Sequence, residues 1–306
     1  MSSASRDSLT LSPKGVSELD ICERHHRRDK SYPILKVLTV QVLKRKLAAA
    51  AFVRKSRLIV GLDFTANTAQ TMGKGSRQEI DRLERDALKV ITSTADYAVS
   101  FKFNYHLVLP LGLFDRIPGL IDKIHGYGLT AIMDCKMNDI GNTNEHAARY
   151  YYDAGFDGII VNPFVGWEGG LDSVFKLAQT KQRGIVTLCY MSHPAADEGY
   201  GLNVAVDKKM KTHEPMYLVF ARRAQSWGSD AVIVGATYPE KISEVKGILG
   251  EEIPIISPGV GAQGGSAAEA ISAGASYVIA VRSIIESPDP GAVAKNLAEE
   301  TQSASS

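Results

Sequence analysis

Eight short apolar runs, separated by longer amphipathic segments, constrain this chain more than any other feature. The runs are rich in β-branched residues and occur at 57–64, 97–103, 130–136, 158–163, 184–190, 231–237, 254–259 and 276–283. Near-continuous apolar strands that alternate with helices predict a parallel sheet covered on both faces. Eight repeats over about 244 residues predict a (β/α)8 TIM barrel. A doubly wound open sheet is the alternative, and it is disfavoured because no G-x-G-x-x-G follows the first run.

The segments outside the repeats suggest three regions. Residues 1–56 form a predicted N-terminal extension, with a polar tail followed by a basic amphipathic helix over 33–56. That helix could lie on a membrane or bind a partner, but packing on its own domain is the preferred interpretation. The barrel is expected over 57–300, and a second polar tail over 301–306.

Composition excludes several classes of protein. The 35 Lys and Arg residues nearly balance 34 Asp and Glu residues, so no nucleic-acid or membrane-surface partner is expected. Neither an uninterrupted 18-residue apolar run nor a secretory h-region is present in the sequence. Three widely separated cysteines, Cys22, Cys135 and Cys189, suit a reducing compartment. We therefore expect a cytoplasmic protein.

Ionisable residues gather at the ends of the predicted strands, where barrel enzymes carry their chemistry. The segment IMDCKMNDIGNT, at 132–143, places Asp134 and Lys136 two apart on one strand, so both should face the barrel interior. Asp139 and Thr143 should share a face at the start of the next helix. Lys102 ends the neighbouring strand. This set is either a buried ion-pair network or a catalytic site, and the added lysine favours catalysis.

Two further segments belong to the same end of the predicted barrel. The glycine-rich turn SPGVGAQGG at 257–265, followed by Arg282, predicts a phosphate site, although a tight turn without a ligand is the simpler alternative. The connection at 191–214 shows little helical or strand pattern and is interpreted as a lid. His193 within it is expected to be solvated.

In their order along the chain, these fragments resemble the orotidine 5′-phosphate decarboxylase family, closest to its archaeal-type, short-loop branch. The resemblance covers roughly 57–290 and rests on LDF at 62–64, FKFN at 101–104, DCKMNDIGNT at 134–143, YMSHP at 190–194, SPGVGAQGG at 257–265 and RS at 282–283. It implies decarboxylation of orotidine 5′-phosphate to UMP in pyrimidine biosynthesis, without a cofactor or metal. It also implies a homodimer.

The resemblance assigns roles to individual residues. The implied catalytic residues are Lys102, Asp134, Lys136 and Asp139, with Lys136 as the proton donor. The implied substrate-binding residues are Asp63, Ile140, Thr143, Ser192, Gln263 and Arg282. Asp63 would bind ribose hydroxyls, Ser192 would contact the pyrimidine, and Gln263 with Arg282 would hold phosphate. Asp139, Ile140 and Thr143 would reach the partner subunit's site.

Two features depart from the family, and two other functions compete with it. Val281 precedes the phosphate arginine where the family commonly has glycine, and the first 56 residues have no counterpart beyond a short helix. A Mg²⁺-dependent sugar-phosphate decarboxylase or aldolase of the same scaffold is one rival, but such relatives carry an acidic residue in place of Lys102. A non-catalytic nucleotide-binding barrel is the other, and it has no need for four clustered charges.

Overall fold

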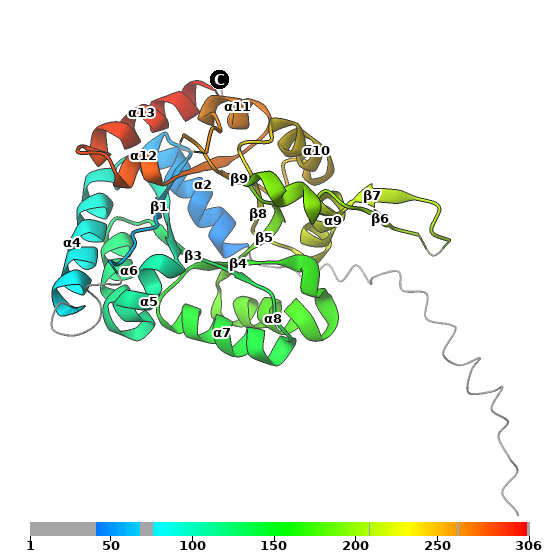
Figure 1. The fold of residues 1–306 in the computed structure, drawn as a ribbon, viewed down its shortest axis with the longest axis horizontal. Helices are drawn as coiled ribbons and strands as arrows, with labels where there is room; N and C mark the ends of the chain where they lie inside the picture. Colours follow the sequence, from blue (N-terminus) through cyan, green and yellow to red (C-terminus); the bar gives the residue numbers. More distant parts are fainter. Residues whose placement is uncertain (1–40, 68–75, 208, 262, 305–306) are drawn as a thin grey trace, which may run out of the picture. The chain divides into compact units, whose positions relative to one another are not determined.

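A computed structural model describes residues 41–67, 76–207, 209–261 and 263–304. Its centre is a closed barrel of eight parallel strands in the order β1-β10-β9-β8-β5-β4-β3-β2 (Figure 1). The strands of the barrel are β1 (Leu58–Leu62), β2 (Ala98–Asn104), β3 (Thr130–Met137), β4 (Gly158–Val161), β5 (Gly184–Tyr190), β8 (Ala231–Val234), β9 (Ile255–Pro258) and β10 (Tyr277–Ala280). Each lies within or next to an apolar run of the sequence, so the predicted TIM barrel is confirmed.

Helices surround the strands and cover their outer faces (Figure 1). The α-helices are α2 (Val42–Arg54), α4 (Ser76–Thr94), α5 (Tyr105–Leu111), α6 (Ile117–Gly126), α7 (Gly141–Asp153), α8 (Asp172–Lys181), α9 (Met216–Trp227), α10 (Pro239–Leu249), α11 (Ala267–Ser272), α12 (Arg282–Ile285) and α13 (Pro290–Ser303). Short 3₁₀ or π segments are η1 (Gly112–Arg116), η2 (Pro163–Val165), η3 (Trp167–Leu171) and η4 (Pro194–Glu198). Helix α13 continues past residue 300, where a polar tail was expected, because Thr301 is fully buried and its hydroxyl accepts from the Arg57 amide.

The N-terminal helix α2 closes one end of the barrel. Its Leu43 side chain is fully buried over the first residues of two strands: a Cβ atom on Gly158 or Gly184 would lie 2.6 or 2.3 Å from it. The Asp230 carboxylate, just before β8, accepts hydrogen bonds from the Leu43 and Lys44 amides and so caps the helix. Helix α2 therefore packs on the barrel, as preferred from the sequence, and belongs to the same compact unit.

A second group of charges joins α2 to the same end of the barrel. The Asp157 carboxylate, just before β4, contacts Lys46 at 2.7 Å, His125 at 2.8 Å and Arg183 at 3.3 Å. Burial opposes ionisation of Asp157, but the hydrogen bonds from His125 and Lys46 outweigh it and lower the pKa of this carboxyl. Because Asp157 and Asp230 precede their strands, α2 covers the N-terminal end and leaves the C-terminal end for the site.

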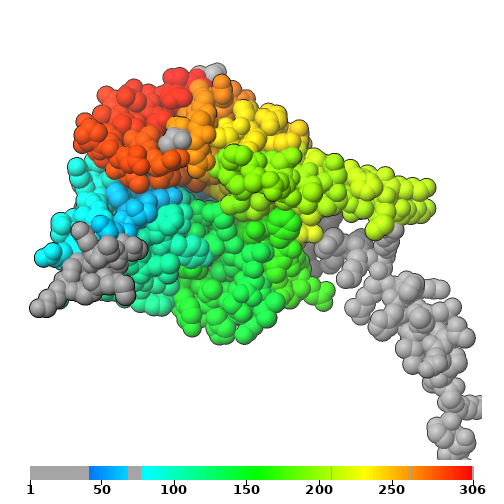
Figure 2. Space-filling model, in the orientation of Figure 1, coloured from blue at the N-terminus to red at the C-terminus, as the bar shows by residue number. Residues whose placement is uncertain are grey.

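The connection after β5 differs from its prediction. It contains η4 and an antiparallel hairpin of β6 (Asn203–Ala205) and β7 (His213–Pro215). The hairpin extends outward beyond α9 and forms a projection on the molecular surface (Figures 1 and 2). Its two strands have only three residues each and are largely exposed, so they lack the apolar alternation by which a strand is detected in sequence.

Among the described residues, no helix combines the length and the apolar character that a membrane-spanning helix needs.

Candidate active site

Four charged side chains meet at the C-terminal mouth of the barrel, and Lys102 is at their centre. Its ammonium, at the end of β2, lies 2.8 and 2.9 Å from the two oxygens of Asp63 and 3.4 Å from Asp134 Oδ2. The lysine is 5% exposed, and such burial is tolerable only because carboxylates lie on both sides. An ammonium thus occupies the position between two carboxylates where a divalent cation would otherwise fit.

Lys136 completes the group from β3. Its Nζ donates to Asp134 Oδ1 at 2.6 Å, so this carboxylate receives one lysine on each oxygen. The side chain of Lys136 is about one-third exposed and faces the open mouth. The sequence prediction that Asp134 and Lys136 share a face is confirmed by this contact. The result is an alternating series of two carboxylates and two ammonium groups.

The backbone of β3 is irregular where it presents Lys136. The register with β4 shifts between Met133 and Met137, and Lys136 has a φ of 41°. A non-glycine residue in this left-handed region costs about 1–2 kcal/mol. The bulge turns the end of the strand and directs the Lys136 side chain back toward Asp134. The strained backbone thus belongs to the residue that places an ammonium against Asp134.

Asp139 lies apart from these four charges. It precedes α7 rather than lying on it, its Oδ1 accepts from the Ile140 amide at 2.7 Å, and its side chain is exposed. No ion pair joins it to the four charged residues within the described part of the chain. Thr143 and Ile140 are exposed as well, Ile140 to 65%. Asp139 was predicted to join Asp134 and Lys136, whereas Asp63 supplies the second carboxylate within this chain.

Asn144, which was not predicted from the sequence, holds the turn that carries Asp139. Its side chain is buried, accepts from the Asp139 amide at 3.1 Å, and donates to the carbonyls of Asp139 and Gly170. Asn104 was also missed; its Nδ2 donates to Asp63 Oδ2 at 3.5 Å. Asn104 and Asn144 could have been identified from the sequence as asparagines that lie close to the clustered carboxylates.

The glycine-rich turn lies beside Ser192. Gly259, Gly261 and Gly264 all have positive φ, between 76° and 101°, and backbone hydrogen bonds from the Gly261 and Gly265 amides close the turn. A Cβ atom on Gly259 would lie 2.9 Å from Gln263 Oε1 and 3.0 Å from Ser192 Cβ. The predicted pyrimidine and phosphate residues therefore meet over this glycine. Thr237 fixes Ser192 from the neighbouring loop by donating to its carbonyl at 3.0 Å.

The segment after β10 contributes Arg282 and Val281. Arg282 begins α12 and is exposed. The Val281 side chain points toward β1, because a Cβ atom on Gly61 would lie only 2.5 Å from Val281 Cγ2. The hydroxyl of Ser283 is buried near Gly261: a Cβ atom on Gly261 would lie 3.6 Å from Ser283 Oγ. The segment after β10 thus lies beside Gly61 of β1 and beside the glycine-rich turn.

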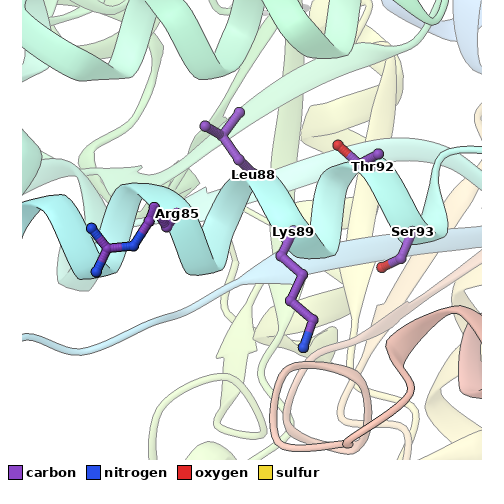
Figure 3. Close-up of a pocket in the computed structure, with 5 residues that line it drawn as sticks. All are labelled: Arg85, Leu88, Lys89, Thr92 and Ser93. Atoms are coloured by element: carbon purple, nitrogen blue, oxygen red, sulfur yellow. The ribbon is translucent and has the colours of Figure 1, made fainter.

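A separate hollow lies on the outside of α4. It is lined by Arg85, Leu88, Lys89, Thr92 and Ser93 (Figure 3). These residues occupy the second half of the helix, which leads back to the start of β2 and so to the N-terminal end of the barrel. None of the predicted site residues lines it.

The closed barrel with a charged C-terminal mouth defines the chain as a (β/α)8-barrel enzyme. Residues 56–297 match the model of the "Orotidine 5'-phosphate decarboxylase / HUMPS family", and the chain belongs to this family. It is 39% identical over 217 residues to orotidine 5′-phosphate decarboxylase of Pyrococcus abyssi, covering 71% of this chain and 93% of the relative. The corresponding protein of Methanococcoides burtonii is 35% identical over 247 residues, with 81% and 98% covered.

Solved structures agree with the sequence relatives. The Methanocaldococcus jannaschii orotidine 5′-monophosphate decarboxylase, solved with the inhibitor BMP, superposes with a TM-score of 0.64 at 29% identity. The superposition covers 80% of this chain and 98% of that one. A putative decarboxylase of Toxoplasma gondii has a TM-score of 0.71 at 22% identity and supports the fold alone. The family expected from the sequence is therefore confirmed.

Proposed function

We propose that the chain decarboxylates orotidine 5′-phosphate to UMP in pyrimidine biosynthesis, with Lys136 as the proton donor. The observation that carries this proposal is the alternating series Asp63, Lys102, Asp134 and Lys136 at the barrel mouth. Lys136, one member of this series, is about one-third exposed and lies on a left-handed backbone, so its ammonium is accessible to a substrate at the mouth. Family membership and the named relatives point to the same reaction.

In this reaction the bond between C6 of the pyrimidine and the carboxylate breaks, CO₂ leaves, and the electron pair stays on C6. That pair lies in the plane of the ring and gains little from delocalisation, so charges fixed in the site must stabilise it. The Lys136 ammonium provides a positive charge there and then transfers a proton to C6. Its partial exposure allows solvent to restore the proton afterwards.

Asp134 and Lys102 hold Lys136 in place. Asp134 accepts from both lysines, so its own charge is balanced when the substrate carboxylate enters. Lys102, fixed by Asp63, keeps the carboxylate from turning away. This preorganisation means that the charges need little rearrangement as negative charge develops on C6. Asp63 and Asn104 border the proposed ribose position.

The phosphate would be held at the glycine-rich turn. We assign this role to Gln263 and Arg282, because an arginine fork suits a phosphate and positive-φ glycines let backbone amides approach it closely. Ser192, next to Gln263 over Gly259, would contact the pyrimidine. Binding energy gained at the remote phosphate would then order residues 191–202, between β5 and the hairpin, around the substrate.

A second copy of the chain would complete the site. Asp139, Ile140 and Thr143 are exposed, and so are Phe114 and Tyr150, whose rings pack edge-to-face at 6.0 Å. Exposed apolar groups of this kind mark protein contacts. We propose that this surface forms a homodimer in which each subunit supplies these three residues to its partner.

The decisive assay follows the loss of orotidine 5′-phosphate by absorbance in the presence of EDTA, for wild type and Lys136→Ala. We expect rapid turnover by wild type and severe loss in the variant. An inactive wild type, or equal rates for the two proteins, would overturn the assignment. Activity that EDTA abolishes would instead favour the metal-dependent rival.

The shared site has its own test. Lys136→Ala mixed with Asp139→Ala should regain about a quarter of wild-type activity, because half of the dimers would be mixed and each would hold one intact site. No recovery, despite exchange verified by mass spectrometry of the intact dimers, would assign Asp139 to its own subunit. An Asp139→Ala variant that is fully active alone would show that Asp139 has no catalytic role.

We also propose the cytoplasm as the location of the enzyme. Cys135 and Cys189 are buried and unpaired, which suits a reducing compartment. The near-zero net charge again provides no reason to expect a nucleic-acid partner.

A further inference from the structure

Gly61, the fourth residue of β1, lies next to the side chains of Val281 and Lys102. It is paired in register with Lys102 on β2, and it is buried. A Cβ atom on Gly61 would lie 2.5 Å from Val281 Cγ2, 3.4 Å from Val281 Cβ and 3.3 Å from Lys102 Cε. Real Cβ atoms do not approach another carbon to 2.5 Å. Any residue larger than glycine would therefore displace Val281, Lys102 or both.

Val281 fills the space that Gly61 leaves. It follows β10, whose Ala280 is the register partner of Val60, so Val281 stands directly across from Gly61. Its side chain is β-branched and stiff, which limits its ability to turn aside. The valine and the aliphatic stem of Lys102 consequently border the same small volume over Gly61.

The charged end of Lys102 depends on where its stem lies. Its hydrogen bonds to both oxygens of Asp63 and to Asp134 leave Nζ little freedom, and the side chain is 6% exposed. A shift of the stem by about one ångström would lengthen the contact to Asp134, which is already 3.4 Å. That contact links Lys102 to the carboxylate that holds Lys136.

We infer that Gly61 and Val281 are a size-matched pair that positions Lys102, with Val281 acting as a positioning residue for the charged site. The expected effect on kcat/KM rests on the proposed function. The placement of Lys102 can also be measured without turnover. Neither residue carries a polar side chain, so neither is a catalytic residue. Their effect is transmitted through the lysine that they border.

Variants that enlarge residue 61, shrink residue 281, or do both test the pair. Gly61→Ala should lower kcat/KM about 100-fold, mainly through kcat, because displacement of a catalytic group by about one ångström has an effect of that size. Val281→Gly should lower it about tenfold, since it leaves Lys102 less confined. Because Val281→Gly removes the atoms that the added methyl group would meet, Gly61→Ala/Val281→Gly should be more active than Gly61→Ala alone. Additive effects would instead make the double variant about 1000-fold slower than wild type.

A matched control comes from the other end of the barrel. A Cβ atom on Gly158 would meet Leu43 Cδ2 at 2.6 Å, the same kind of contact, but it would lie on β4, two strands away from Lys102, and would crowd helix α2 instead of the charged residues. Gly158→Ala should lower the unfolding midpoint without lowering kcat, and Val281→Gly should not rescue it. Loss of kcat in this control would mean that any crowded barrel glycine affects the site, and the inference would fail.

Chemical labelling provides the readout that needs no substrate. Acetic anhydride should modify Lys102 several-fold faster in Val281→Gly than in wild type, with Lys136 in the same protein as the internal reference. Mass spectrometry of peptides measures both. An unchanged Lys102 rate would overturn the inference, even if the enzyme acts on another substrate. An active wild type with no recovery in the double variant would overturn it as well and leave the proposed function intact.

Failure of Gly61→Ala to fold would not end the test. The double variant should then recover soluble, folded protein, because the clash is removed, and labelling of Val281→Gly would still report on Lys102. Failure of both Gly61→Ala and the double variant to fold would contradict the pairing of the two side chains.

Discussion

Lys136 donates a 2.6 Å hydrogen bond to Asp134 from a backbone in the left-handed region, with φ at 41°. Both residues lie on β3, and the strained lysine is the one that we propose as proton donor. Glycine adopts this backbone without cost, whereas alanine carries the same Cβ penalty as lysine. The backbone strain can therefore be separated from the loss of the amine.

Lys136→Gly and Lys136→Ala should both abolish decarboxylation, because each removes the ammonium. Lys136→Gly should nevertheless be about 1 kcal/mol more stable than Lys136→Ala, since only glycine relieves the left-handed strain. Urea unfolding of the two variants measures the difference. Equal stabilities, or greater stability of the alanine variant, would show that the bulge is not strained at this residue.

The β6–β7 hairpin should be dispensable for turnover. The amide of Met216 donates to the carbonyl of Leu202 at 2.8 Å, so the two ends of the hairpin are adjacent and a short glycine linker can join them. Because the hairpin points outward (Figure 2), replacement of 203–215 should leave kcat and KM unchanged. A large fall in kcat would mean that the hairpin takes part in closure, as the sequence-based lid hypothesis holds. Circular dichroism provides the control for folding.

The barrel strands were predictable because each is a nearly continuous apolar run bounded by helix-forming sequence. The run at 184–190 coincides with β5 residue for residue. The contacts within the site were less predictable, because they join residues distant in sequence. Lys102 pairs with Asp63, 39 positions away, whereas Asp139, close to Lys136 in sequence, makes no ion pair with it among the described residues. Proximity in sequence was a poor guide once a turn intervened.

The position of α2 on the barrel was likewise not predictable from the sequence. The sequence predicts an amphipathic helix over 33–56; its later part is observed as α2, and its first part, 33–40, lies outside the described residues. Nothing in the sequence of this helix indicates that Leu43 enters the barrel end above Gly158 and Gly184. The only indication in the sequence is the two glycines themselves, which leave room for the Leu43 side chain.

Leu43→Ala should destabilise the protein by about 2–5 kcal/mol, the usual cost of a cavity in place of a fully buried leucine. The activity of the folded enzyme should stay unchanged, because α2 covers the N-terminal end of the strands and the charged residues lie at the other end. Guanidinium unfolding and kcat on the same preparation check both parts. Phe52→Ala, at an exposed position of the same helix, is the matched control and should have little effect on stability. A fall in kcat for Leu43→Ala would show that the two ends of the barrel are coupled.

Asp230 should make the stability fall as pH rises from about 4 to about 6. Burial raises the pKa of Asp230 to about 6, despite the hydrogen bonds from the amides of Ile185, Lys44 and Leu43. The folded state therefore holds a proton that the unfolded chain releases near pH 4, and the stability that this proton provides is complete below about pH 4 and lost above about pH 6. A shift of about two pH units corresponds to roughly 3 kcal/mol.

Urea unfolding across this pH range measures the slope, which Asp230→Asn should remove, although the variant will be less stable throughout. Asp207→Asn is the control: hydrogen bonds from Thr212 and neighbouring amides lower the pKa of the exposed Asp207 carboxyl to about 2. Its contribution is therefore lost only as pH falls below about 4, outside the tested range. If the three amides bound to Asp230 outweigh its burial, stability will rise with pH in wild type, and α2 will be held most firmly by the ionised carboxylate.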